Sequence, residues 1–469
     1  MTTPALRPLL ALLVAAPLAC APPPPEPPPR RAPPPTTRLV HLDADLAVTA
    51  AAPDRARVSG EARWRVVLGE EGSIGLDAVE MDVQRLSVTS ATGAPVPATW
   101  EATDARLTVT PRAAPGASLT VAVRYQAEPA RGVTVGEGGA MWTTFHTWRW
   151  LPASRDPSQR ATLRLTVTAP DHPEGVVIAT GDGPGSPGPD VASQLPHPSY
   201  LWGFYVGPAE PTTDTTALPL TLWAPDAAHP GLAVARDRTI AAWRRWRGDG
   251  APWPRDPSEG RAPYTLVFVP GRVAQELAGM AFIGAGYLDT LTRDPTEDWL
   301  LVHELAHEVW GNRVTCATWG DFWLNEAVVV WWVARDKALR GDQAGYAREV
   351  RLWEERVARA LARGDDPRIA RPGATSDTAG GSIVYHGGAL LLHDLTAAVG
   401  EERLLGALHG AMRDALAQGS LPLSADALLN RLALPPDARR AVEARLLDAG
   451  SRHQLPRLPP RAAHGLTDG

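Results

Sequence analysis

The sequence predicts an α+β fold, with a β-rich amino-terminal domain over residues 39–215 followed by a mostly helical domain over residues 216–452. Two patterns carry this prediction: short alternating runs fill the first region, and longer runs of helical period fill the second. The 469 residues include only two cysteines, which excludes a disulfide-stapled fold. With 46 basic and 52 acidic residues, no electrostatic footprint for nucleic acid stands out.

The chain begins with a predicted signal peptide over residues 1–19. Arg7 precedes an apolar stretch from Leu9 to Leu18 that is too short to span a bilayer. Ala19 followed by Cys20 is similar to the processing box of bacterial lipoproteins, in which the cysteine is lipidated. We therefore expect an exported protein of the bacterial cell envelope, anchored to a lipid bilayer through Cys20 and facing the periplasm or the exterior. An ordinary cleaved signal with an incidental cysteine is the alternative.

A proline-rich segment follows the expected anchor. Ten prolines lie between Pro22 and Pro35, and such a composition favours an extended polyproline helix with about 3.1 Å per residue. We expect residues 20–38 to form a tether, in which the stretch from Pro22 to Pro35 reaches about 40 Å. At the other end of the chain, residues 453–469 are expected to form a flexible tail.

Strands are expected throughout the region from Leu39 to about Gly207. Runs such as Leu107-Thr108-Val109-Thr110 alternate apolar and polar residues, and turn signals such as Thr92-Gly93 separate them. Helical patterns begin with residues 233–246. We expect the domain boundary near residues 210–216, where Pro, Thr and Asp cluster.

The segment His303-Glu304-Leu305-Ala306-His307 contains the candidate chemistry. It follows Asp294-Pro295-Thr296-Glu297, whose capping aspartate, first-turn proline and later glutamate predict a helix start. Histidines four residues apart project from one face of a helix and can reach a single cation. Such pairs also occur as core or surface residues without a ligand, so a third ligand is needed to support a metal site.

Glu326 supplies that third ligand. Eighteen residues separate it from His307, and it lies in the first turn of a second expected helix. Two histidines and one carboxylate form the shell of an open zinc site, in which one position is left for water. Glu304 is offset by one residue from His303, so it can address the water rather than the metal. Cys316 lies between the two ligand segments, and we interpret it as a buried packing residue.

The stretch from His303 to Glu326 resembles the zinc-binding motif of the gluzincin aminopeptidases, the family of membrane alanyl aminopeptidase and leukotriene hydrolase. Residues 150–161 and 384–389 are similar to two further stretches of that family. The resemblance implies a β-rich saddle domain followed by a thermolysin-like catalytic domain. It also implies that His303, His307 and Glu326 bind one zinc ion.

The same resemblance assigns roles to two more residues. Glu304 would be the general base that takes a proton from the zinc-activated water, and Tyr385 would stabilise the oxyanion. Gly279, Met280 and Ala281 correspond to the family's Gly-Ala-Met-Glu-Asn strand, which lies along the substrate. The glutamate of that strand, which grips the free amino terminus, is replaced by Ala281, and a second amine contact falls at Thr143.

We therefore predict a zinc metallopeptidase that hydrolyses peptides, with aminopeptidase action favoured by kinship. One alternative is a zinc peptidase without a free-amine requirement, which cleaves internal or amino-blocked sites. The other is a non-catalytic peptide-binding protein of the envelope. Because little chain follows Gly450, we also expect the large helical domain of many relatives to be absent and the cleft to be open. The sequence does not predict an oligomeric state.

Overall fold

The computed structural model describes residues 36–181, 188–253 and 264–450. The expected signal peptide, the lipidation site Cys20, most of the proline-rich tether and the carboxy-terminal tail lie outside the described residues and stay predictions. Within those three ranges, no helix is both long and apolar enough to cross a membrane.

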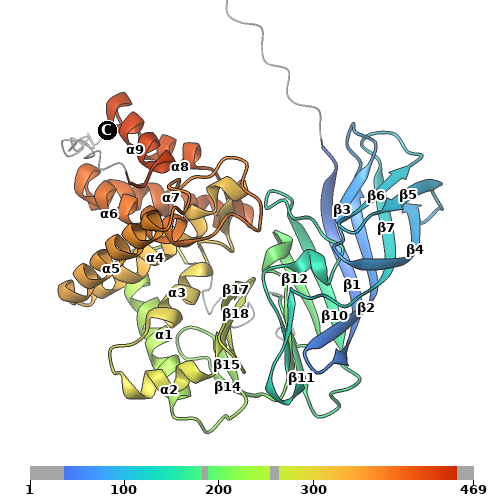
Figure 1. The fold of residues 1–469 in the computed structure, drawn as a ribbon, viewed down its shortest axis with the longest axis horizontal. Coiled ribbons are helices and arrows are strands. Elements are labelled where there is room, and N and C mark those ends of the chain that lie inside the picture. The colour runs from blue at the N-terminus through green and yellow to red at the C-terminus, as the bar shows by residue number, and fades with distance from the viewer. Residues whose placement is uncertain (1–35, 182–187, 254–263, 451–469) are drawn as a thin grey trace, which may run out of the picture. The chain divides into compact units, whose positions relative to one another are not determined.

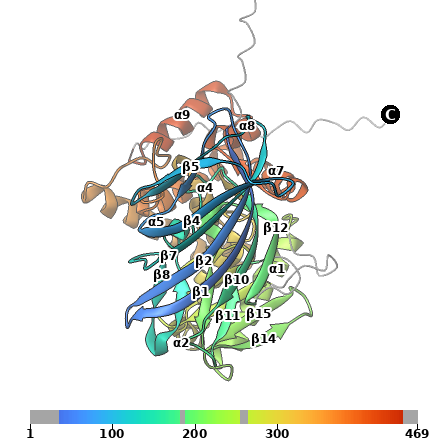
Figure 2. The same cartoon turned by 90° about the vertical axis from the view of Figure 1, so that its right-hand side faces the viewer.

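The first part of the chain is built on a six-stranded sheet (Figures 1 and 2). The strands are mostly antiparallel, but β1 and β10 run parallel. Their order is β12 (Asp190–His197), β10 (Ala161–Thr168), β1 (Arg38–Ala52), β2 (Arg55–Val67), β7 (Ser118–Ala127) and β4 (Met81–Ser90).

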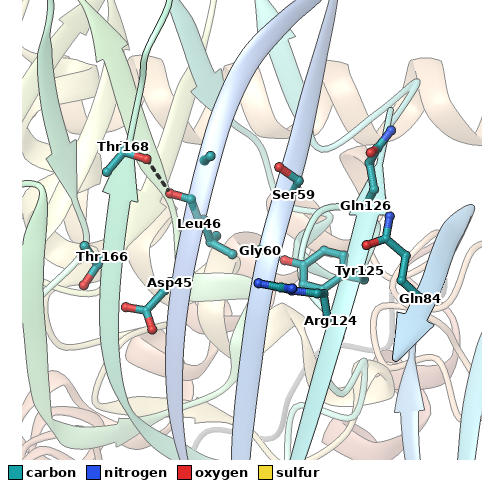
Figure 3. A pocket seen from close by; sticks show the side chains of 11 residues that line it. Asp45, Leu46, Ser59, Gly60, Gln84, Arg124, Tyr125, Gln126, Thr166 and Thr168 are labelled. Carbon is teal, nitrogen blue, oxygen red and sulfur yellow. Dashed lines mark hydrogen bonds between the residues drawn. The ribbon is translucent and has the colours of Figure 1, made fainter. Parts of the chain in front are cut away.

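The two faces of this sheet follow the alternation in the sequence. Leu42 and Leu46 of β1 are buried in the core, whereas the intervening Asp43 and Asp45 lie on the polar face. Figure 3 shows a pocket beside Gly60 of β2, with the side chains of Asp45 and Ser59 among those that line it. A Cβ atom at Gly60 would lie 2.1 Å from the carbonyl oxygen of Asp45, so only glycine fits this close approach of β1 and β2.

Two smaller sheets complete the β-rich part, which confirms that its sequence pattern indicates strands. The first has the order β3 (Ile74–Asp77), β6 (Arg106–Pro111) and β5 (Ala98–Ala102). The second has the order β11 (Val176–Ala179), β13 (Phe204–Gly207), β9 (Met141–Thr143) and β8 (Val133–Val135).

A five-stranded sheet opens the second part of the chain. Its first strand lies within the boundary expected near residues 210–216, because residues 210–214 pair with the next strand. Its order is β14 (Glu210–Asp214), β15 (Leu220–Ala224), β16 (Tyr264–Val269), β18 (Met280–Gly284) and β17 (Ala274–Leu277). Strand β18 is therefore paired on both sides, and β17 forms an edge of the described sheet.

Helices dominate the rest of the second part (Figure 1), which confirms the predicted α+β fold. A two-stranded pairing of β19 (Val314–Cys316) with β20 (Leu421–Leu423) lies among them. The helices are α1 (Gly231–Gly248), α2 (Gly286–Arg293), α3 (Trp299–His307), α4 (Trp323–Leu339), α5 (Gln343–Ala362), α6 (Gly388–Val399), α7 (Glu401–Gln418), α8 (Ala425–Leu432) and α9 (Pro436–Leu447).

Helix α4 is the central helix of this part, because every residue from Trp323 to Asp336 is buried. Asp336 is 1 % exposed, and its carboxylate accepts hydrogen bonds from Arg245 (2.6 and 2.9 Å) and from Trp246 Nε1 (2.8 Å) on α1. A buried charge is tolerated only when it is paired and hydrogen-bonded in this way. The contact therefore fixes α4 against α1.

Helix α6 crosses α4 at very short range. A Cβ atom at Gly388 would lie 2.4 Å from the Cβ of Ala327, one residue after Glu326. Neither atom is the end of a flexible side chain, so a larger residue at position 388 has to push the helices apart. The close approach thus depends on glycine.

We expect Gly388→Ala to lower the free energy of unfolding by about 1–3 kcal/mol, the usual cost of overpacking a core. Gly406→Ala is the matched control, because Gly406 lies in α7 where an added Cβ atom would meet open space. In the control, alanine should stabilise the helix by up to about 1 kcal/mol. Denaturant unfolding followed by tryptophan fluorescence measures both, and equal effects of the two substitutions would contradict the packing argument.

Candidate metal centre

Helix α3 carries two of the predicted metal ligands, but it begins at Trp299, four residues later than the capping pattern predicted. Asp294 does not cap it and instead accepts a hydrogen bond from the amide of Thr296 (2.8 Å) in the preceding turn. The carboxylate of Glu297 accepts the first amide of the helix, that of Trp299 (2.8 Å), and the hydroxyl of Tyr287 (2.6 Å). This longer-range contact with α2 decides where the helix starts.

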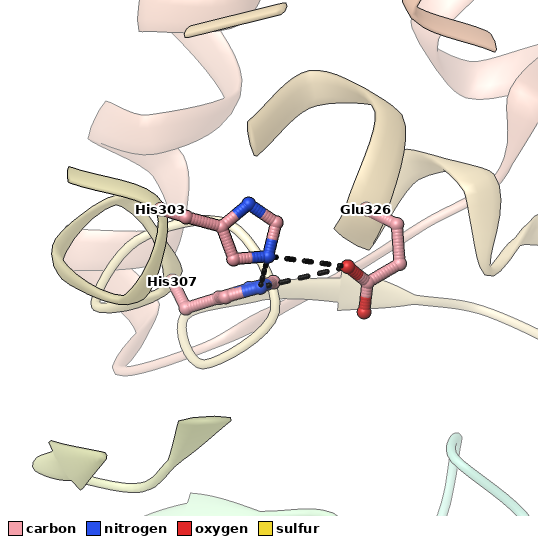
Figure 4. Close-up of side chains that lie close together, drawn as sticks. All are labelled: His303, His307 and Glu326. Carbon is pink, nitrogen blue, oxygen red and sulfur yellow. Dashed lines mark hydrogen bonds and ion pairs between the residues drawn. The ribbon is translucent and has the colours of Figure 1, made fainter. Parts of the chain in front are cut away.

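The three predicted ligands converge on one point (Figure 4). Nε2 of His303 and Nε2 of His307 lie 3.2 Å apart, and they lie 3.7 and 3.6 Å from Oε2 of Glu326. The side chains are 8 %, 2 % and 3 % exposed. Among the described residues, they form a group of His, Cys, Asp or Glu side chains whose ligand atoms lie within 4.8 Å of one another.

These distances fit zinc. Ligand atoms about 2.1 Å from a tetrahedral zinc ion lie about 3.4 Å from one another, close to the three separations above. Burial lowers the pKa of His303 well below its ordinary value, so this imidazole is neutral and offers a lone pair. Two nitrogen ligands and one oxygen ligand also match an open zinc site rather than a closed structural one.

The two histidines are oriented in different ways. Nδ1 of His307 donates to the carbonyl oxygen of Trp310 (2.8 Å), which leaves Nε2 free for a metal. Nδ1 of His303 has no hydrogen-bond partner among the described residues. Its ring instead stacks on Trp299, one helical turn earlier, with the ring centres 4.6 Å apart and the planes 16° apart.

Glu304 and Tyr385 both face the charges of this cluster. Burial raises the pKa of Glu304 to about 8, and its Oε2 has no hydrogen-bond partner among the described residues. Tyr385 lies in a π-helical turn, Ile383–Gly387, that leads into α6. Burial and the negative charges of Glu326 and Glu276 raise the pKa of the Tyr385 phenol well above its ordinary value, so the phenol stays protonated.

Glu276 is a further carboxylate of the site that the sequence did not reveal. It is 7 % exposed, and its Oε1 has no hydrogen-bond partner among the described residues. Burial raises its pKa to about 7, while His307 lowers and Glu326 raises that value, so Glu276 lies close enough to interact with both ligands. The hairpin thus brings a carboxylate to the site, although the position of the family's glutamate is occupied by Ala281.

The register of the hairpin explains the omission. Residues 274–277 and 280–284 are antiparallel, and Glu276 lies directly opposite Ala281, the position where a glutamate was expected. Gly279, Met280 and Ala281, the predicted substrate residues, lie in the turn of this hairpin and in β18, which pairs with β16 and β17. Their role in substrate binding stays a prediction. Strand β17 lies at an edge of the described sheet. Glu276 could have been predicted from the sequence only if the tight turn that follows it had been recognised, because that turn sets the hairpin register.

Two other residues that the sequence singled out make structural contacts instead. Thr143 is buried, and its hydroxyl accepts the amide of Phe204 (3.0 Å) within the β-rich part. Cys316 is a free, fully buried thiol, as expected for a packing residue, and burial raises its pKa.

Proton release should accompany zinc binding. Although burial lowers the pKa of His307, the negative charges of Glu326, Glu276 and Glu304 outweigh it and raise the pKa to about 10. His307 therefore holds a proton at pH 7, and a metal must displace it. Zinc affinity should rise about tenfold per pH unit between about pH 6 and pH 8 for each proton displaced.

Calorimetric titration with zinc in buffers of different ionisation enthalpy counts these protons. We expect about one or more at neutral pH. A zinc affinity that does not change with pH, together with no proton release, would contradict the charge distribution described above.

Comparison with known proteins agrees with this geometry. Residues 290–420 match the model of the peptidase family M1 domain. The chain is 35 % identical over 85 residues to leucine aminopeptidase 2 of Eremothecium gossypii, over 18 % of this chain and 13 % of that protein. It is 27 % identical over 281 residues to aminopeptidase N of Streptomyces lividans, over 54 % of this chain and 31 % of that protein. The matched part thus spans well under half the length of either relative.

Solved structures share the fold over most of the chain. Yeast LTA4 hydrolase in complex with bestatin superposes with a TM-score of 0.70 at 17 % identity, over 91 % of this chain and 69 % of that one. The M1 zinc metallopeptidase of Deinococcus radiodurans gives 0.69 at 22 % identity, over 91 % and 97 %. At these identities the likeness establishes the fold. The family model identifies residues 290–420 as a peptidase family M1 domain, and the ligand set of His303, His307 and Glu326 fits zinc as its cofactor.

Proposed function

We propose that the protein is a zinc aminopeptidase, which removes residues from the free amino terminus of peptides. The observation that carries this proposal is the convergence of two buried carboxylates, Glu304 and Glu276, on the ligand cluster of His303, His307 and Glu326. Glu304 suits proton transfer during hydrolysis, and Glu276 suits recognition of a peptide amine. Neither is explained by a site that only stores a metal.

When bound, zinc supplies a Lewis acid that polarises a carbonyl oxygen and lowers the pKa of a coordinated water to about 7. Glu304 accepts the proton of the attacking water and then returns it to the leaving amine. A carboxyl group whose burial raises its pKa to about 8 can do both near neutral pH. Tyr385 keeps its proton and donates a hydrogen bond to the developing oxyanion.

Glu276 accounts for the requirement of a free amine. A peptide ammonium loses its hydration when it enters a buried site, and only a nearby carboxylate compensates for that loss. The unpartnered Oε1 of Glu276 on edge strand β17 offers this contact within the described part of the chain. The substrate backbone would pair with the same strand, which sets the scissile bond at a fixed distance from the anchored amine.

Glu304→Gln tests the chemical step. We expect kcat/KM to fall by about 10²- to 10⁴-fold, the usual contribution of a general base, while zinc content stays the same. Glu349→Gln on α5 is the control, because Glu349 is also a buried glutamate but pairs with Lys337. Metal analysis and a peptide digest read by mass spectrometry give both values. Undiminished hydrolysis by the Glu304 variant would exclude this mechanism, and a zinc-loaded wild-type protein without activity would favour the peptide-binding alternative.

Comparing a free peptide with its N-acetylated form tests the amine requirement. The wild type should cleave the free peptide about 10²- to 10⁴-fold faster, because a buried carboxylate left unpaired costs about 3–5 kcal/mol. Glu276→Gln should abolish most of this preference, whereas Glu210→Gln, on the opposite edge strand of the same sheet, should preserve it. Equal cleavage of both peptides by the wild type would favour the alternative of a peptidase that accepts blocked or internal sites.

A further inference from the structure

A single hydroxyl group from the β-rich part reaches both segments that carry the metal ligands. It belongs to Tyr200, which lies in the short 3₁₀ turn Ser199–Leu201 and is 1 % exposed. Its Oη accepts a hydrogen bond from Nδ2 of Asn325 at 2.8 Å and donates one to the carbonyl oxygen of Gly311 at 3.3 Å. Both partners belong to the second part of the chain.

The contact with Asn325 acts on Glu326, the next residue along the chain. Asn325 is fully buried in the first turn of α4. Its Oδ1 accepts the backbone amide of Cys316 at 2.8 Å, which fixes the orientation of the side-chain amide and leaves Nδ2 for Tyr200. With both ends of the amide occupied, the first turn of α4 is held in one position, and with it the carboxylate of Glu326.

The contact with Gly311 acts on His307. Gly311 has a φ of +108°, and a Cβ atom at this position would lie 2.8 Å from Nδ1 of His307. The adjacent carbonyl oxygen, that of Trp310, accepts the hydrogen bond from the same Nδ1. The turn that Tyr200 holds is therefore the turn against which the imidazole of His307 rests.

The 3₁₀ turn itself is firmly held. The ring of Tyr200 packs on Phe145 and Trp319, with ring centres 5.2 and 5.3 Å apart. The carbonyl oxygen of Leu201 accepts the amide of Ala278, in the turn of the hairpin that carries Glu276, at 2.9 Å. A rigid support of this kind can transmit position to the groups that it contacts.

We propose that Tyr200 is a positioning residue of the zinc centre, whose hydroxyl holds the His307 and Glu326 segments at the spacing that the ion requires. It contacts neither ligand and acts through Asn325 and Gly311. The proposal concerns the retention of zinc, so it can be tested without measuring peptidase activity.

Tyr200→Phe removes the hydroxyl and keeps the ring. Tyr205→Phe is the matched control, because Tyr205 is also fully buried in the β-rich part, but its hydroxyl donates to the carbonyl oxygen of Pro208 (3.0 Å) nearby. Each full-length, zinc-loaded protein is mixed with an excess of a colorimetric chelator, and the rate of zinc release is recorded. A second measurement compares the visible absorption spectra of the Co²⁺-loaded proteins, which report the ligand geometry.

We expect zinc release from the Tyr200 variant to be about 10- to 100-fold faster than from the wild type, with an altered Co²⁺ spectrum. The Tyr205 variant should match the wild type in both measurements. Release from the Tyr200 variant within about twofold of the wild type would overturn the proposal. Equal acceleration in both variants would also overturn it, because it would indicate a general loss of packing rather than positioning.

Discussion

The site buries several ionisable side chains that have too few hydrogen-bonding or oppositely charged partners to balance their charges. His303, His307, Glu304 and Glu326 are all buried, and Glu276 lies beside them. Unpaired buried charges are strongly unfavourable, so such a cluster has to share protons or bind a cation. The raised pKa values of Glu304, Glu276 and His307 indicate that the cluster shares protons when no cation is bound. The convergence of three ligand atoms on one point indicates that it can bind a cation instead.

The rest of the fold keeps these groups in place. Helix α4 brings Glu326 to the cluster, and it is fixed by the buried pairing of Asp336 with Arg245 and by the close crossing of α6 at Gly388. Helix α3 brings both histidines, and its first turn is fixed by Glu297. Because these anchors lie at different points of the two helices, the separation of the ligand atoms is set by packing and not by the metal alone.

The sequence revealed those features of the site that depend on local spacing. Helical periodicity places His303 and His307 on one face, and Glu326 falls in the first turn of a buried helix, so three ligands were predictable from residue types and intervals. Glu276 was missed because its place opposite Ala281 depends on a hairpin register, which residue spacing within one strand does not define. The start of α3 was also misplaced, because it depends on a contact that is not local: Tyr287 of α2 donates a hydrogen bond to Glu297.

The turn Ser199–Leu201 contacts both the hairpin that carries Glu276 and the segment that carries Glu326. Leu201 accepts the amide of Ala278 in the hairpin that presents Glu276, and Tyr200 accepts the side-chain amide of Asn325 beside Glu326. Anchoring a peptide amine and orienting a metal are useful together only if the distance between the two contacts is constant, because a displacement of about 1 Å can cost about 10²-fold in rate. One short turn that contacts both segments keeps that distance constant. The β-rich part is therefore a structural component of the metal site, although it provides none of the three ligands.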